Sequence, residues 1–60
     1  MNLLVFSEYG FAINIDRIDG LCVDKHDKNI TSIYVGGSEE PWKVNKPLDE
    51  VLMLIRERSR

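Results

Sequence analysis

The sequence predicts an α+β fold: a four- or five-stranded antiparallel β-meander with one C-terminal α-helix packed on one face. Two patterns support this fold. Within residues 3–44, short runs of β-branched and aromatic residues alternate with glycine-containing or polar turns, as expected for strands. Residues 45–58 carry apolar side chains at helical spacing behind a helix start signal. Because the chain has 60 residues, we expect residues 1–60 to form a single small domain.

Two strands are expected near the N-terminus. Leu3-Leu4-Val5-Phe6 is a short apolar run, and Gly10 suits a hairpin loop because glycine tolerates positive φ. In residues 11–15, large apolar residues alternate with a small or a polar residue, which is typical of a half-buried strand. The alternation places three side chains on one face: Phe11, Ile13 and Ile15.

Further strands are expected over residues 21–24, 30–35 and 41–44. Gly20 precedes the first of them and indicates a bulge or bend. The polar residues 25–29 are typical of a hairpin loop, and residues 36–40 of a second turn. Pro41 lacks a backbone N–H donor, so it belongs at a strand start or a sheet edge.

The C-terminal helix is expected at about residues 47–58, with Asn45 as a favoured N-cap and Pro47 in the first turn. Asp49 and Glu50 suit the positive end of the helix dipole. The spacing i, i+3, i+4, i+7 predicts one apolar stripe, made of Leu48, Val51, Leu52 and Ile55.

One helix covers one face of a sheet, and the other face then keeps some apolar side chains exposed, drawn from Leu4, Phe6, Ala12, Cys22 and Tyr34 according to the register. A chain this short buries only about 60% of its unfolded surface. Cys22 is the one cysteine, so no intrachain disulfide can strengthen the core. We therefore expect self-association to contribute to stability.

Composition argues against several classes of protein. The formal net charge is −2, whereas a nucleic-acid-binding domain needs a basic patch. No apolar run approaches the ~20 residues of a membrane span. The apolar start of the chain lacks the basic segment of a signal peptide, so we expect a cytoplasmic protein with no membrane partner.

Catalytic, cofactor and metal sites are not expected. His26 lies in a polar turn with Asp24 and Asp27, which falls short of the ligand sets of zinc and calcium. Cys22 lacks an evident base with an orienting group, and we interpret it as a small hydrophobe in a strand. Gly36-Gly37-Ser38 lacks the lysine of a phosphate-binding loop, so we interpret it as a turn.

Four apolar residues are candidates for a protein interface: Phe6, Tyr34, Trp42 and Met53. Trp42 is the only tryptophan, and tryptophan and tyrosine are enriched at binding hot spots. The alternative for Trp42 is a core residue that packs against the helix. Met53 lies opposite the predicted helix stripe, where the sheet cannot cover it.

Several segments resemble the small FlbD-like proteins of flagellar operons: residues 12–18, Ile33-Tyr34-Val35-Gly36-Gly37, Trp42-Lys43-Val44 and residues 49–55. This resemblance implies a meander of strands followed by a helix. A second resemblance is to the C-terminal half of LytTR-type DNA-binding domains, which also run from strands into a helix. The chain is too short for that whole domain and lacks its basic base-reading loops.

We therefore expect a non-enzymatic interaction or accessory protein, encoded by a flagellar operon or a phage, that forms a homo-oligomer or binds a protein partner. The alternative is a nucleic-acid-binding regulator that resembles half of a LytTR-type domain. This alternative requires Arg17, Lys25, Lys28, Lys43 or the arginines of the C-terminal tail to gather on one surface.

Overall fold

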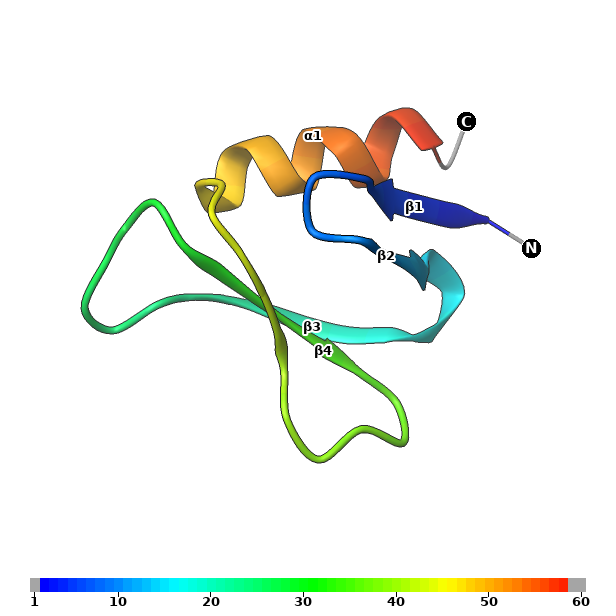
Figure 1. Cartoon of the computed structure of the whole chain (residues 1–60), viewed down its shortest axis with the longest axis horizontal. Coiled ribbons are helices and arrows are strands. Elements are labelled where there is room, and N and C mark those ends of the chain that lie inside the picture. The colour runs from blue at the N-terminus through cyan, green and yellow to red at the C-terminus, as the bar shows by residue number, and fades with distance from the viewer. Residues whose placement is uncertain (1, 59–60) are drawn as a thin grey trace.

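The computed structural model describes residues 2–58 and contains five strands, one short 3₁₀ segment and one α-helix (Figure 1). The elements in chain order are β1 (Leu3–Phe6), β2 (Phe11–Asn14), η1 (Ile15–Arg17), β3 (Ile18–Val23), β4 (Thr31–Val35), β5 (Trp42–Val44) and α1 (Leu48–Arg58). The predicted α+β class and the antiparallel pairing are confirmed.

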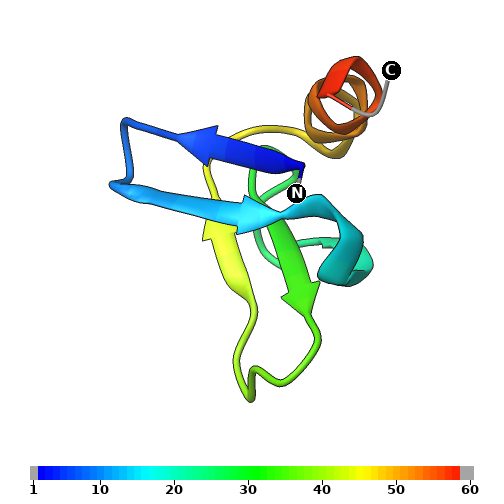
Figure 2. The same ribbon diagram turned by 90° about the vertical axis from the view of Figure 1, so that its right-hand side faces the viewer.

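The strands form two sheets instead of one continuous meander. β1 and β2 make a hairpin, and β3, β4 and β5 make a separate sheet in that order. The division occurs at η1, where the Asn14 side chain accepts a 3.0 Å hydrogen bond from the Asp16 N–H and turns the chain away from β2. Figure 2 shows the hairpin strands crossing those of the three-stranded sheet at a steep angle.

Two glycines take the predicted roles. Gly10 has φ of 77° in the β1–β2 turn, where its N–H donates to the Phe6 carbonyl at 2.9 Å. Near Gly20 the register of β3 against β4 shifts, which confirms the bulge. Residue 19 is the extra residue there, since Ile18 faces Val35 and Gly20 faces Tyr34.

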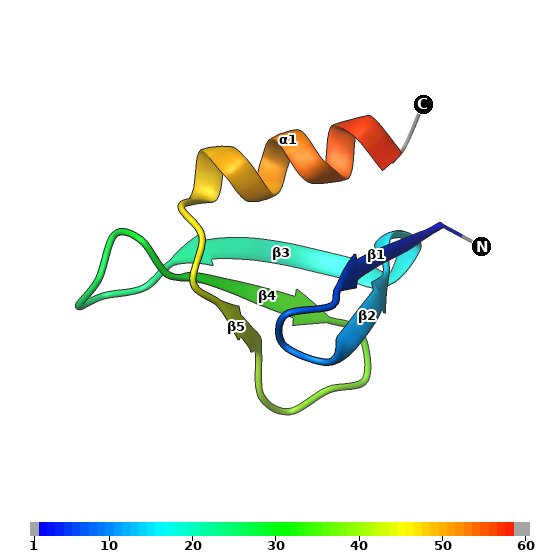
Figure 3. The same ribbon diagram turned by 45° about the horizontal axis from the view of Figure 1, so that its top comes forward.

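The core lies between the three-stranded sheet on one side and the hairpin and α1 on the other. Every element except η1 and β3 contributes at least one buried hydrophobic residue to this core. These residues are Leu4, Phe6, Ile13, Ile33, Val44 and Val51. The helix therefore does not cover the sheet face by itself, because the β1–β2 hairpin shares that face. Figure 3 shows α1 running beside β3, and α1 contacts β1 and β3.

The predicted outer face needs correction for two residues. Leu4 and Phe6 are buried, because β1 turns these alternate side chains toward the core and leaves Leu3 and Val5 exposed. Phe11, Ile13 and Ile15 do face the core, as predicted.

The start of α1 also differs from the expectation. The Pro47 carbonyl accepts from the N–H groups of Glu50 and Val51, so the helix begins at Leu48 and Asn45 is not its N-cap. The Asn45 N–H instead donates to the Tyr9 hydroxyl at 2.7 Å. The segment before the helix is held to the sheets, and this sets where the first helical turn can form.

The apolar stripe of α1 is rotated from its predicted position. Val51 is buried, and Leu54 and Ile55 pack against the core, whereas Leu52 keeps 41% of its surface exposed. The reason is the place of α1 between β1 and β3, which turns the Leu54 side of the helix toward β1 and leaves Leu52 beside the edge of β3.

Candidate protein interface

The four predicted interface residues do not form one patch. Phe6 is only 2% exposed and belongs to the core, so it cannot contact a partner in this fold. Trp42 and Tyr34 lie on neighbouring strands but on opposite faces, because Trp42 is in register with Ile33 and side chains alternate along β4. Met53, 59% exposed, points outward from α1.

Trp42 packs against the hairpin. Its ring centroid lies 4.7 Å from that of Phe11, and Phe11 in turn lies 5.3 Å from Phe6. Tyr9 completes this aromatic cluster, 6.0 Å from Phe11. The cluster joins the two sheets through aromatic contacts, which favour tilted and edge-on arrangements at these distances. Trp42 still exposes 42% of its surface.

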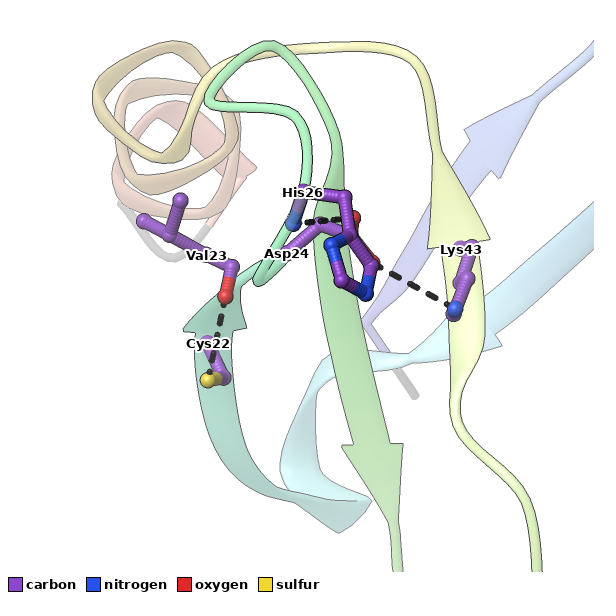
Figure 4. A network of polar contacts seen from close by, with 5 residues as sticks. All are labelled: Cys22, Val23, Asp24, His26 and Lys43. Carbon is purple, nitrogen blue, oxygen red and sulfur yellow. Dashed lines mark hydrogen bonds and ion pairs between the residues drawn. The ribbon is translucent and has the colours of Figure 1, made fainter.

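The outer face of the three-stranded sheet is polar. Cys22, Ser32 and Lys43 form one cross-strand row, and a shallow depression of about 590 Å³ extends from this row to Asp24, His26 and Tyr34. Figure 4 shows the polar contacts that join Asp24 to His26 and to Lys43. The His26 N–H donates to the Asp24 carboxylate at 3.0 Å, and the Lys43 ammonium lies 3.4 Å from it.

The hydrogen bond from the His26 backbone, together with Lys43, holds the pKa of Asp24 below its ordinary value of 3.8. The Cys22 thiol donates to the Val23 carbonyl at 3.3 Å and makes no hydrogen bond to the His26 ring among the described contacts. Cys22 is in a strand as predicted, but it is exposed. Within residues 2–58 no group of three or more His, Cys, Asp or Glu side chains could hold a metal ion.

Several basic side chains have structural partners in separate places. The Arg17 guanidinium donates to the Gly36 carbonyl at 3.2 Å, on the turn between β4 and β5. Lys46 lies 3.1 Å from Glu50 and 3.3 Å from Glu8, and these hydrogen bonds raise the pKa of Lys46. Arg60 lies outside the described residues, so the predicted cluster of tail arginines is placed only in part. The nucleic-acid alternative stays a prediction.

An apolar groove between α1 and β3 is a feature that sequence reasoning missed. It has a volume of about 340 Å³ and is lined by residues from η1, β3 and α1: Ile15, Ile18, Asp19, Gly20, Leu21, Leu52 and Ile55. β3 is also an edge strand, since it pairs only with β4 among the described strands. The bulge at Gly20 was the one available signal, because bulges are common at sheet edges.

Comparisons of the chain with protein-family models, curated proteins and solved structures found no match. Among residues 2–58, no helix is long and apolar enough to cross a membrane.

Proposed function

We propose that this protein is a small non-enzymatic interaction protein that works as a self-associated unit in the cytoplasm. The observation that carries the proposal is the number of large hydrophobic residues that the fold leaves exposed, compared with the number that it buries. Among the described residues, six hydrophobic ones are buried, whereas eight large ones are exposed: Leu3, Val5, Tyr9, Val23, Tyr34, Trp42, Leu52 and Met53. Single exposed hydrophobic residues are normal on protein surfaces, and here eight of them accompany a core of six buried residues with seven partly buried ones packed against it.

The small size of the core gives a reason for association. A core of this size rarely supplies more than ~3–5 kcal/mol of stability, and small domains commonly add a disulfide, a metal or a second subunit. Cys22 is a free thiol, and it fits a reducing compartment such as the cytoplasm. The resemblance to FlbD-like proteins is consistent with an accessory role and stays a prediction.

Sedimentation velocity from about 1 to 100 µM tests the proposal. A shift from monomer to a discrete oligomer over this range supports it, and a urea midpoint that rises with protein concentration gives a second measure, since association stabilises the folded state. A chain that sediments as a monomer throughout and unfolds independently of concentration rejects it. Salt-dependent binding to duplex DNA would instead favour the regulator class.

A further inference from the structure

We propose that the pocket between β2, η1 and the β4–β5 turn binds a small aromatic carboxylate. The pocket has a volume of about 350 Å³, at the lower end of the range for small-molecule sites. The residues that carry the argument are Asn14, Arg17 and Trp42, which all line it. This inference goes beyond the self-association proposed above, because neither the site nor its test requires a second copy of the chain.

The β4–β5 turn holds the Arg17 side chain in place. The Arg17 guanidinium donates to the Gly36 carbonyl at 3.2 Å, and the Gly36 N–H donates to the Arg17 carbonyl at 2.9 Å. A Cβ added at Gly37 would lie 3.5 Å from the Arg17 Nη2 atom, so the guanidinium lies close to the backbone of the turn. A guanidinium has five N–H donors, and the described contacts use one of them. The other donors can bind an oxyanion, and arginine pairs with carboxylates in a planar, bidentate geometry.

The polar side chains that line the pocket are mainly hydrogen-bond donors. The Asn14 side-chain oxygen already accepts from the Asp16 N–H, which leaves the two amide N–H groups of Asn14 without a described partner. The Trp42 indole N–H has no partner among the described hydrogen bonds either. Within residues 2–58, no aspartate or glutamate lines this pocket. Such a set of groups is complementary to a carboxylate, which only accepts hydrogen bonds.

Trp42 gives the pocket an aromatic wall. The Trp42 ring packs against Phe11, with the centroids 4.7 Å apart, and the residue still exposes 42% of its surface. Ile13 and Val35 also line the pocket and add aliphatic surface. Aromatic rings favour offset and tilted arrangements, so a flat ring can pack beside Trp42. The pocket therefore suits a ligand that joins a flat apolar body to one acidic group.

Acidic residues near the pocket favour a single negative charge on the ligand. Four of them are close in the sequence to lining residues: Asp16, Asp19, Glu39 and Glu40. The Asp19 carboxylate lies 3.5 Å from the position of a Cβ added at Gly36. A phosphate dianion would meet more repulsion from these carboxylates than a singly charged ligand would. The charges thus favour an aromatic carboxylate over an aromatic phosphate.

NMR titration of the wild-type chain with naphthoate tests the site. Trp42 is the only tryptophan, so its single indole N–H signal reports directly on the pocket. We expect naphthoate to shift this signal and the Arg17 Nε–H signal, with a Kd on the order of 1 mM as is usual for ligands of this size. Naphthylmethanol has the same rings and no charge, and it should bind at least about ten-fold more weakly. Naphthyl phosphate should also bind more weakly than naphthoate.

Two substitutions that each remove one positive charge locate the bound anion. Arg17→Gln should raise the Kd of naphthoate about ten-fold, because a charged donor is lost. Lys25→Gln is the matched control, since Lys25 lies in the β3–β4 loop and does not line this pocket. It should leave the Kd unchanged. Circular dichroism verifies that both variants fold, and the comparison of ligands on the wild-type chain depends on neither variant.

Four outcomes would overturn the proposal. Equal affinity for naphthoate and naphthylmethanol would mean that the carboxylate is not recognised, and equal losses in the two variants would mean that only the overall charge matters. Tighter binding of naphthyl phosphate would make the site a phosphate site. Shifts confined to Leu21 and Leu52 would place the ligand in the groove between α1 and β3. None of these outcomes bears on self-association, which sedimentation of the chain without ligand decides.

Discussion

The hydroxyl of Tyr9 accepts a 2.7 Å hydrogen bond from the backbone N–H of Asn45, which connects the β1–β2 turn to the segment that leads into α1. Lys46 reinforces the same connection through its ion pairs with Glu8 and Glu50. The hairpin, β5 and the helix therefore meet at one point. This junction holds the two sheets in place where no strand pairing joins them among the described strands.

Tyr9→Phe removes that hydrogen bond and keeps the aromatic ring. We expect the free energy of unfolding to fall by about 1 kcal/mol, the usual net value of one hydrogen bond. Urea denaturation followed by tryptophan fluorescence measures the change. Tyr34→Phe is the matched control, because Tyr34 is exposed and makes no described hydrogen bond. Equal losses in the two variants would contradict the role of the Tyr9 hydroxyl.

The rotation of α1 can be tested by truncating one helix position at a time. Val51 has no exposed surface, so Val51→Ala should cost roughly 2 kcal/mol of stability through lost packing. Met53→Ala should change stability by less than about 0.5 kcal/mol, as is usual for surface substitutions. Thermal unfolding of both variants compares them. A Met53 variant as unstable as the Val51 variant would mean that the helix faces the sheet differently.

The positive φ of Gly10 predicts that alanine substitutions at Gly10 and at Gly20 will affect stability differently. Nothing lies within 4 Å of a Cβ added at Gly10, so Gly10→Ala should cost roughly 1–2 kcal/mol through backbone conformation alone. Gly20 has equally open space but no positive φ, and Gly20→Ala should be neutral or stabilising. Chemical denaturation at low protein concentration distinguishes the two. A destabilised Gly20 variant would show that the bulge needs glycine for another reason.

Asp24 predicts how stability depends on pH in acid. Its folded-state pKa is lowered, so its contribution to stability is present above pH 3.8 and is lost as pH falls through the folded value. Carboxyl NMR titration should place the Asp24 pKa below 3.8. The hydrogen bond from the His26 backbone N–H is the largest single cause and outweighs desolvation, so Lys43→Met should leave the Asp24 pKa below 3.8. A return of the pKa to its ordinary value in that variant would make Lys43 the main cause.

Much of this fold could be predicted from the sequence because strand and turn signals are local. The alternation around Ile13, the positive φ at Gly10 and the bulge at Gly20 each depend on a few neighbouring residues. The division into two sheets could not be predicted, since it depends on the turn that the Asn14 side chain stabilises.

The candidate interface is less predictable because it depends on how the elements face one another. Helical spacing identifies an apolar stripe that includes Leu52, but it does not say which edge of the stripe meets the sheet, and the structure turns Leu54 inward instead. The direction of Phe6 depends on the register of β1, which the short apolar run does not fix. The open edge of β3 follows from strand order, which depends on contacts between distant residues.

The two edge strands of the three-stranded sheet, β3 and β5, differ in how readily a further strand could pair with them. Next to β5, Pro41 on one side has no N–H to offer, and on the other side the N–H of Asn45 already binds the Tyr9 hydroxyl. These two positions, one on each side of β5, therefore offer no free N–H to an incoming strand. Fewer open backbone donors at one edge of a sheet limit the edge-to-edge pairing that leads to fibres.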